Sequence, residues 1–213
     1  MNLINLKKTN YFRYIQIKNL NNKIIEELSL LFLFEIETFK ILNSVTEPTL
    51  KKIRFQWIIE EIENEKKNLF IISKLSKLFK KEKIKQDIIN ILINFRDFEF
   101  DFSNIEEIII FFKKNNQFYN KIFSSLTKNE KRPFNISFSS QLIYFFYFKK
   151  EIDEDILIKL LSFYKRNKFF SCNNVEVSFL RLFFSKISKK KNLKISKLEF
   201  IFNLIVDSIK NEI

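Results

Sequence analysis

Residues Leu31–Ile62 read LFLFEIETFKILNSVTEPTLKKIRFQWIIEEI, and this stretch decides the fold of the chain. Its apolar residues recur every three or four positions on both sides of a polar interruption at Asn43-Ser44, a spacing typical of amphipathic helices. Ser44 or Thr46 can cap the second helix, and Pro48 suits its first turn, where a missing backbone N–H costs nothing. The stretch therefore predicts two helices that meet at a short turn.

Helical spacing continues through the rest of the chain, without the sustained two-residue alternation that marks strands. Within the decisive stretch, the helix Thr49–Leu69 is expected to bury Ile53, Trp57, Ile58 and Ile62. The other predicted helices are Leu20–Leu42, Ile71–Phe79, Ile84–Phe95, Ile105–Phe123, Ser139–Phe148, Asp153–Tyr164, Val177–Ile187 and Ser196–Ile213. No repeat or domain break interrupts them. The sequence therefore predicts one all-α domain over residues 1–213.

Missing residue types exclude several kinds of site in this chain of 213 residues. The absence of His excludes Cys/His zinc sites and His-based triads, and the absence of Gly excludes a P-loop and a GxGxxG nucleotide cradle. Cys172 is the single cysteine, so no internal disulfide can form, which suits a reducing compartment. We expect no secretory signal, and no apolar run approaches the roughly 18 to 20 residues of a membrane span. The expected protein is soluble or peripheral.

The charge balance is strongly basic, with 38 Lys and Arg against 25 Asp and Glu and a formal net charge of +13. Such an excess is typical of proteins that contact nucleic acid or an anionic membrane surface. The chain also lacks Ala and Gly and is rich in Ile, Phe, Lys and Asn, so we expect an extremely AT-rich host genome whose codon usage explains part of the lysine excess. No RNA-binding motif accompanies the Lys and Phe, and a nucleic-acid partner is therefore not expected.

The decisive stretch resembles the signature of the squalene/phytoene synthase family. It is closest to the non-catalytic branch containing the mitochondrial complex I assembly factor and alphaproteobacterial relatives, which reads roughly FNxELAxVxDSVSEPxxGxxRxQWW. The matching positions are Phe34, Glu37, Ser44, Val45, Glu47, Pro48, Arg54, Gln56 and Trp57, with Asn43 and Thr46 in place of its Asp and Ser. The resemblance implies an all-α, single-domain helical bundle of the trans-isoprenyl synthase (terpenoid synthase) type, reduced in size.

Active members of the family hold Mg²⁺ with aspartates four residues apart on one face of each of two helices. In this sequence the first motif falls on Leu42, Asn43, Thr46 and Glu47, and only Glu47 is a carboxylate. Leu42, Asn43 and Thr46 are therefore lost metal positions. The segment that matches the second motif, residues 159–164, contains no carboxylate. The resemblance implies no catalytic residue, no metal and no cofactor, and Mg²⁺ only if the protein is an active synthase.

A further match to the family, an ARExDL-like motif, falls on residues 95–100. Its charged pair, with residues of the decisive stretch, predicts a semi-buried hydrogen-bond network, because the planar fork of Arg engages carboxylates two-handedly. Breaking such a network would cost roughly 3–5 kcal/mol. The alternative is a set of ordinary surface pairs worth about 1 kcal/mol or less. The predicted structural or binding residues are Glu37, Glu47, Arg54, Gln56, Trp57, Arg96 and Asp97.

By this resemblance the protein is expected to be non-catalytic and to assist assembly of respiratory complex I (NADH:quinone oxidoreductase). Its expected partners are a complex I subunit or assembly protein, a lipid or isoprenoid in the cavity, and an anionic membrane surface. Its expected location is cytoplasmic or peripheral on the inner membrane of an AT-rich bacterium, on the matrix side if mitochondrial. The alternatives are a divergent Mg-dependent head-to-head prenyl transferase acting on allylic diphosphates and a basic RNA-binding protein. Fold similarity alone does not decide between these functions.

Overall fold

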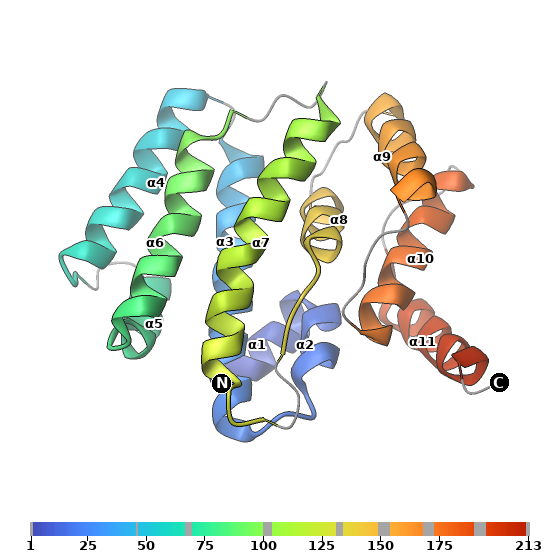
Figure 1. Cartoon of the computed structure of the whole chain (residues 1–213), viewed down its shortest axis with the longest axis horizontal. Coiled ribbons are helices and arrows are strands. Elements are labelled where there is room, and N and C mark those ends of the chain that lie inside the picture. Colours follow the sequence, from blue (N-terminus) through green and yellow to red (C-terminus); the bar gives the residue numbers. More distant parts are fainter. Residues whose placement is uncertain are drawn as a thin grey trace. The chain divides into compact units, whose positions relative to one another are not determined.

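The computed structural model describes residues 2–45, 47–66, 70–99, 104–130, 134–148, 154–167, 173–189 and 195–211. These ranges hold eleven helices and no strand (Figure 1). The expected all-α class is confirmed. The helices are α1 (Asn2–Thr9), α2 (Tyr11–Ile17), α3 (Asn22–Ser44), α4 (Pro48–Glu63), α5 (Phe70–Phe79), α6 (Glu82–Asp97), α7 (Ile105–Leu126), α8 (Phe138–Phe148), α9 (Glu154–Asn167), α10 (Asn174–Ser188) and α11 (Lys197–Asn211).

The turn of the decisive stretch differs in detail from the expectation. Ser44 is the last residue of α3 and so cannot cap α4, while Thr46 lies outside the described residues. Glu47 takes the N-cap position without a side-chain cap hydrogen bond, and Pro48 opens α4 as expected. Helix α4 ends at Glu63, six residues before the predicted end of this helix. The predicted turn is correct, and its predicted cap at Ser44 is wrong.

The chain divides into two compact units. Unit 1 comprises Met1–Glu99 and Lys114–Asn135, and unit 2 comprises Phe100–Lys113 and Ile136–Ile213. Helix α7 therefore contributes residues to both units. A single domain over residues 1–213 remains a prediction, and the two units are described separately.

Unit 1 is built around α3, which packs against α1, α2, α4 and α5, while α4 also packs against α6 (Figure 1). Buried aromatic rings fill its core in two groups. Phe32 of α3 lies 5.5 Å from Phe123 and 6.1 Å from Phe134, measured between ring centroids. Phe95 of α6 lies 6.2 Å from Phe39 and stacks on Phe55 at 5.9 Å. Each buried ring removes a large apolar area from water, so these groups are a main source of stability.

A buried ion pair joins α2 to α3 beneath these rings. The side chains of Arg13 and Glu35 have no exposed surface. Arg13 Nε donates to Glu35 Oε2 and Arg13 Nη2 donates to Oε1, both at 3.1 Å, in the two-handed geometry of strong charge-assisted bonds. A third donor, Arg13 Nη1, reaches Gln16 Oε1 at 3.0 Å. The guanidinium also lies over the rings of Phe12 and Phe32.

Unit 2 uses a buried carboxylate to hold the start of α8. Glu176 of α10 has no exposed surface and accepts from the backbone N–H of Ser137 at 3.1 Å and from Ser140 Oγ at 2.7 Å. The first N–H groups of a helix lack partners within the helix, and a negative charge there is favoured by the helix dipole. Glu176 therefore fixes α8 to α10.

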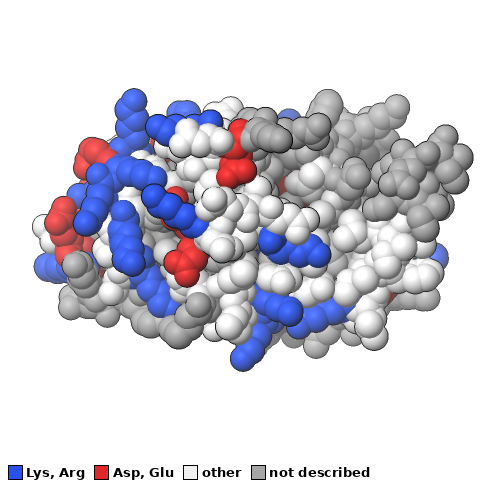
Figure 2. Space-filling view, turned by 90° about the horizontal axis from the view of Figure 1, so that it is seen from below, with Lys and Arg blue, Asp and Glu red and all other residues white. Residues whose placement is uncertain are grey.

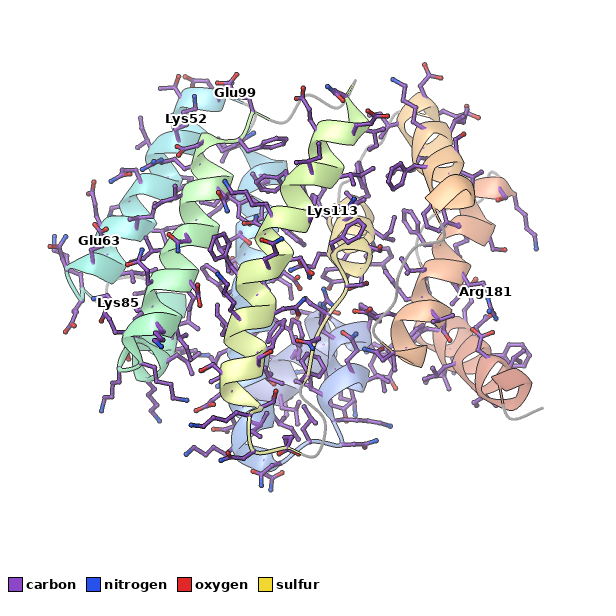
Figure 3. All side chains as sticks on the ribbon, viewed as in Figure 1. Lys52, Glu63, Lys85, Glu99, Lys113 and Arg181 are labelled. Carbon is purple, nitrogen blue, oxygen red and sulfur yellow. The ribbon has the colours of Figure 1, made fainter. Side chains whose placement is uncertain are left out.

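Basic side chains are conspicuous on the surface. Figure 2 shows Lys and Arg gathered toward its left side, over the part of unit 1 that holds α4, α5 and α6, with fewer acidic side chains between them. Some of these charges are paired, as Lys52 is with Glu99 at 2.9 Å (Figure 3). None of the described helices is both long and apolar enough to cross a bilayer.

Candidate functional site

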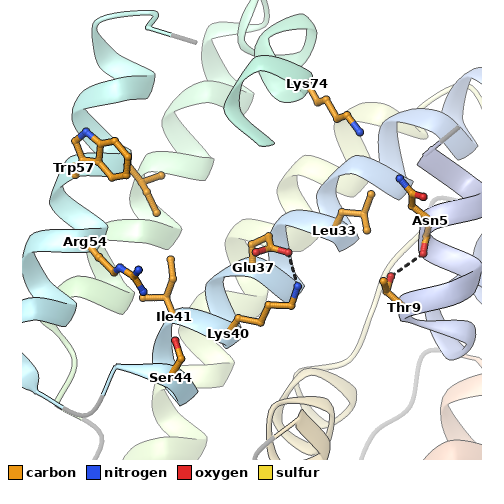
Figure 4. Close-up of a pocket in the computed structure, with 11 residues that line it drawn as sticks. Asn5, Thr9, Leu33, Glu37, Lys40, Ile41, Ser44, Arg54, Trp57 and Lys74 are labelled. Carbon is orange, nitrogen blue, oxygen red and sulfur yellow. Dashed lines mark hydrogen bonds and ion pairs between the residues drawn. The ribbon is translucent and has the colours of Figure 1, made fainter. Parts of the chain in front are cut away.

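A groove of about 570 Å³ lies in unit 1, and four helices line it (Figure 4). Helix α3 forms one wall, because Leu33, Glu37, Ile41 and Ser44 recur every three or four residues and so share one helix face. The lining residues are Asn5 and Thr9 of α1; Leu33, Glu37, Lys40, Ile41 and Ser44 of α3; Arg54, Trp57 and Ile58 of α4; and Lys74 of α5. The groove is therefore the place where sequence-distant parts of unit 1 meet.

The charges of the groove are unbalanced. Three cations line it, Lys40, Arg54 and Lys74, against the single carboxylate of Glu37. Glu37 is already paired, since Lys40 Nζ donates to its Oε1 at 2.7 Å, and both side chains are about half exposed. The guanidinium of Arg54 has no hydrogen bond or ion pair within the part of the chain that the structure describes. The groove thus presents an uncompensated cation beside apolar walls.

Trp57 lines both this groove and a second hollow. The second hollow is lined by Lys52, Ile53, Gln56, Trp57, Glu60 and Arg96. Trp57 is 47% exposed and Ile53 is 57% exposed. The expectation that these two residues belong to the core is wrong, whereas Ile58 and Ile62 are buried as expected. The buried face of α4 is instead completed by Phe55 and Ile59.

Three of the predicted network residues form one cluster at the second hollow. Arg96 Nη1 donates to Gln56 Oε1 at 2.6 Å, and Arg96 Nε and Nη2 donate to the two Asp97 oxygens at 2.7 and 3.0 Å. The hydrogen bond from Arg96 lowers the pKa of Asp97, and the same bond raises the pKa of Arg96. Gln56 Nε2 in turn donates to Glu60 at 2.9 Å. Because Asp97 is 56% exposed, this cluster is a surface network rather than a buried one.

The remaining predicted residues take no part in the hydrogen bonds of that cluster within the described part of the chain. Glu37, Arg54 and Trp57 line the first groove, but no hydrogen bond joins Glu37 to Arg54. Glu47 is exposed at the start of α4 and makes no side-chain cap bond. The predicted seven-residue network is thus divided between the groove and the surface cluster, and Glu47 belongs to neither. Trp57 contributes to both hollows.

The described residues at the lost metal positions do not fit Mg²⁺, which is bound through carboxylate and other oxygen ligands. Leu42 is buried in the core, 8% exposed, and Asn43 supplies an uncharged amide. Thr46 lies outside the described residues, as does Cys172. Across the described ranges, no three His, Cys, Asp or Glu side chains gather in a way that could hold a metal ion.

The amino-acid sequence alone did not predict several of the residues that line the groove. Asn5 and Thr9 come from α1, which the apolar spacing did not predict, and Thr9 Oγ1 bonds the backbone oxygen of Asn5 at 2.8 Å. Lys40 follows Glu37 by three residues, so its pairing could have been found from helical spacing. Lys74 enters only through the packing of α5 on α3, for which the sequence carries no local signal.

Comparison of the chain with family models, with curated proteins and with solved structures gives no match.

Proposed function

We propose that this protein is a non-catalytic, squalene/phytoene synthase-like binding protein that holds an anionic amphiphile in the groove of unit 1. We further propose that it assists assembly of respiratory complex I at the surface of the inner membrane. The assembly role rests on the resemblance of residues 34–57 to the signature of the complex I assembly factor branch. The binding activity rests on one observation, the unpaired guanidinium of Arg54 among the described residues, beside the apolar walls of the groove.

The chemistry of the groove favours a ligand with an anionic head and an apolar body. Arg54 presents a planar set of donors that can engage a phosphate or carboxylate two-handedly. Leu33, Ile41, Ile58 and the ring of Trp57 offer apolar contacts to a hydrocarbon chain. A volume of about 570 Å³ lies within the usual range for small-ligand sites. An isoprenoid diphosphate and a phospholipid share this chemistry.

The scarcity of carboxylates in the groove favours ligand binding over prenyl transfer. Ionisation of an allylic diphosphate by Mg²⁺ calls for carboxylates beside the substrate. The groove has one carboxylate, that of Glu37, and this carboxylate already accepts a hydrogen bond from Lys40. The described residues at the lost metal positions add an apolar side chain at Leu42 and an amide at Asn43.

The binding proposal can be tested with the protein's own fluorophore, because Trp57 is the single tryptophan of the chain and lines the groove. Titration with farnesyl diphosphate, and separately with an anionic phospholipid below its micelle concentration, should change its emission saturably. Arg54→Gln removes a charge-assisted contact of about 1.5–3 kcal/mol and should weaken binding by roughly 10- to 100-fold. Lys52→Gln is the matched control, since Lys52 lies on the same helix but lines the second hollow.

Equal affinity of the Arg54→Gln variant and the unaltered protein for both ligands would contradict the binding site. Condensed squalene or phytoene from farnesyl or geranylgeranyl diphosphate with Mg²⁺ would contradict the non-catalytic assignment. The assembly role is tested by depleting the protein in its host and separating respiratory complexes on native gels. Normal complex I, or a host genome without its subunits, would contradict that role while leaving the binding site intact.

A further inference from the structure

Helix α11 buries an acidic side chain and leaves several large apolar side chains exposed. Its buried residues within the described part are Phe200 and Asp207, at 3% and 4% exposure. Leu198, Phe202 and Ile205 are 81%, 67% and 53% exposed. At about 100° per residue, these three lie within about 60° of one another and roughly opposite Phe200. An acid is buried and an apolar stripe faces outward.

Polar and aromatic contacts with α10 hold the inward face of α11. Ser178 Oγ donates to Asp207 Oδ2 at 2.8 Å, and Arg181 pairs with the other oxygen of Asp207 (Figure 3). The ring of Phe200 meets that of Phe179 edge-on at 6.4 Å. These contacts fix the rotation of α11 about its axis, so the outward position of the stripe is imposed by the packing of α10 on α11.

Basic side chains lie at one end of the stripe. The two acids of α11 in the described range are neutralised by α10, because Lys186 pairs with Glu199 at 3.0 Å and Arg181 pairs with Asp207. Lys189 and Lys197 are exposed at the end of the two helices where Leu198 lies.

We propose that the outward face of α11 docks on an anionic lipid bilayer, with Leu198, Phe202 and Ile205 inserted among the acyl chains. The stripe is about 10 Å long, from a rise of 1.5 Å per residue, so its apolar area alone gives weak and reversible attachment. Stable attachment of a peripheral protein takes a second signal, and basic residues at an anionic surface provide one. The stripe and the basic end of α10 and α11 supply both signals. This proposal stands independently of the groove in unit 1.

Vesicle sedimentation of the full chain tests the surface. Binding is expected to vesicles containing phosphatidylglycerol, to be weak on pure phosphatidylcholine, and to fall as salt is raised. Replacing the stripe in Leu198→Ser/Phe202→Ser/Ile205→Ser should lower binding on the order of tenfold or more. The matched control is Ile4→Ser/Ile110→Ser/Ile158→Ser, because these residues are 59%, 64% and 50% exposed but lie on three different helices. The control should bind as the unaltered protein does.

Insertion of the stripe into the bilayer can be measured by the fluorescence of a single tryptophan placed in it. In the variant Trp57→Phe/Phe202→Trp, brominated acyl chains should quench emission, whereas in Trp57→Phe/Ile158→Trp they should not. Far-UV circular dichroism confirms that each variant is folded. Equal vesicle binding by the stripe variant and the control, or no quenching of the indole introduced at Phe202, would overturn the proposal. So would a lipid-free dimer, seen by analytical ultracentrifugation, that the stripe substitutions dissociate, since a second copy would then cover the face.

Discussion

Removing one member of the Arg13–Glu35 pair should destabilise unit 1 far more than removing both. Both side chains are completely buried, and two hydrogen bonds of 3.1 Å join them. Glu35→Leu leaves the guanidinium buried without its anion, and Arg13→Met leaves the carboxylate without its cation. Each single substitution is expected to lower the free energy of unfolding by about 3–5 kcal/mol, because it strands a buried charge.

The double variant Arg13→Met/Glu35→Leu replaces both charges with apolar side chains of similar size. It loses the bond to Gln16, worth about 1 kcal/mol, and the cation–π contacts with Phe12 and Phe32, worth roughly 0.5–2 kcal/mol. It should therefore lose only about 1.5–3 kcal/mol. The two single substitutions together would remove about 6–10 kcal/mol if they acted independently. The expected coupling energy between the two sites is thus at least about 3 kcal/mol.

Urea unfolding followed by far-UV circular dichroism and by Trp57 fluorescence gives the four free energies of the cycle. A second cycle on Lys40 and Glu37 serves as the control, because that pair is about half exposed and should couple by about 1 kcal/mol or less. Additivity at Arg13 and Glu35 to within about 0.5 kcal/mol would refute the reasoning. So would a coupling energy no larger than that of the exposed pair.

Two further predictions concern buried groups of each unit. Tyr119 is fully buried, and its pKa is raised well above the usual 10.0, first by burial and then by the charge of Glu35. The unfolded chain therefore releases the Tyr119 proton at a lower pH than the folded chain does, and the free energy of unfolding falls as the pH rises above about 10. Tyr119→Phe should make that fall shallower when urea unfolding is measured between about pH 9 and pH 11. An unchanged dependence of the free energy of unfolding on pH would contradict this prediction. In unit 2, Glu176→Gln replaces the charge-assisted hydrogen bonds from Ser137 and Ser140 with neutral ones. This change should lower the free energy of unfolding by about 1–3 kcal/mol. An unshifted thermal melting curve would count against the role of Glu176 at the start of α8.

Long segments with a regular apolar spacing predicted their helices correctly, since α3, α6 and α7 lie within a few residues of their predicted positions. Helices α1 and α2 have only eight and seven residues, too few for a repeating apolar pattern to stand out. The buried face of α4 was misjudged because Leu50, Ile53 and Trp57 add a second apolar face to the buried one. Spacing alone does not decide which of two apolar faces a neighbouring helix covers.

The division of the candidate site could partly be predicted from the angle between residues around α4. Arg54 and Gln56 are two residues apart on α4 and therefore about 200° apart around it, so they cannot both face one network. Helical geometry alone thus separates the groove from the cluster around Arg96. The pairing of Arg13 with Glu35 joins residues 22 positions apart and depends on how α2 packs on α3. The available signal was Glu35, an acid placed between the apolar residues Phe34 and Ile36.

The sharing of α7 between the units has a consequence for the order in which the protein is made. Unit 1 includes Lys114–Asn135, which the ribosome adds only after Phe100–Lys113 of unit 2. Phe123 and Phe134, which close the aromatic group around Phe32, belong to this late segment. The nascent amino-terminal half must therefore keep Phe32 without its final neighbours until translation has passed Asn135. No single cut in the gene separates the two units, because a fragment that contains all of one unit also carries a segment of the other.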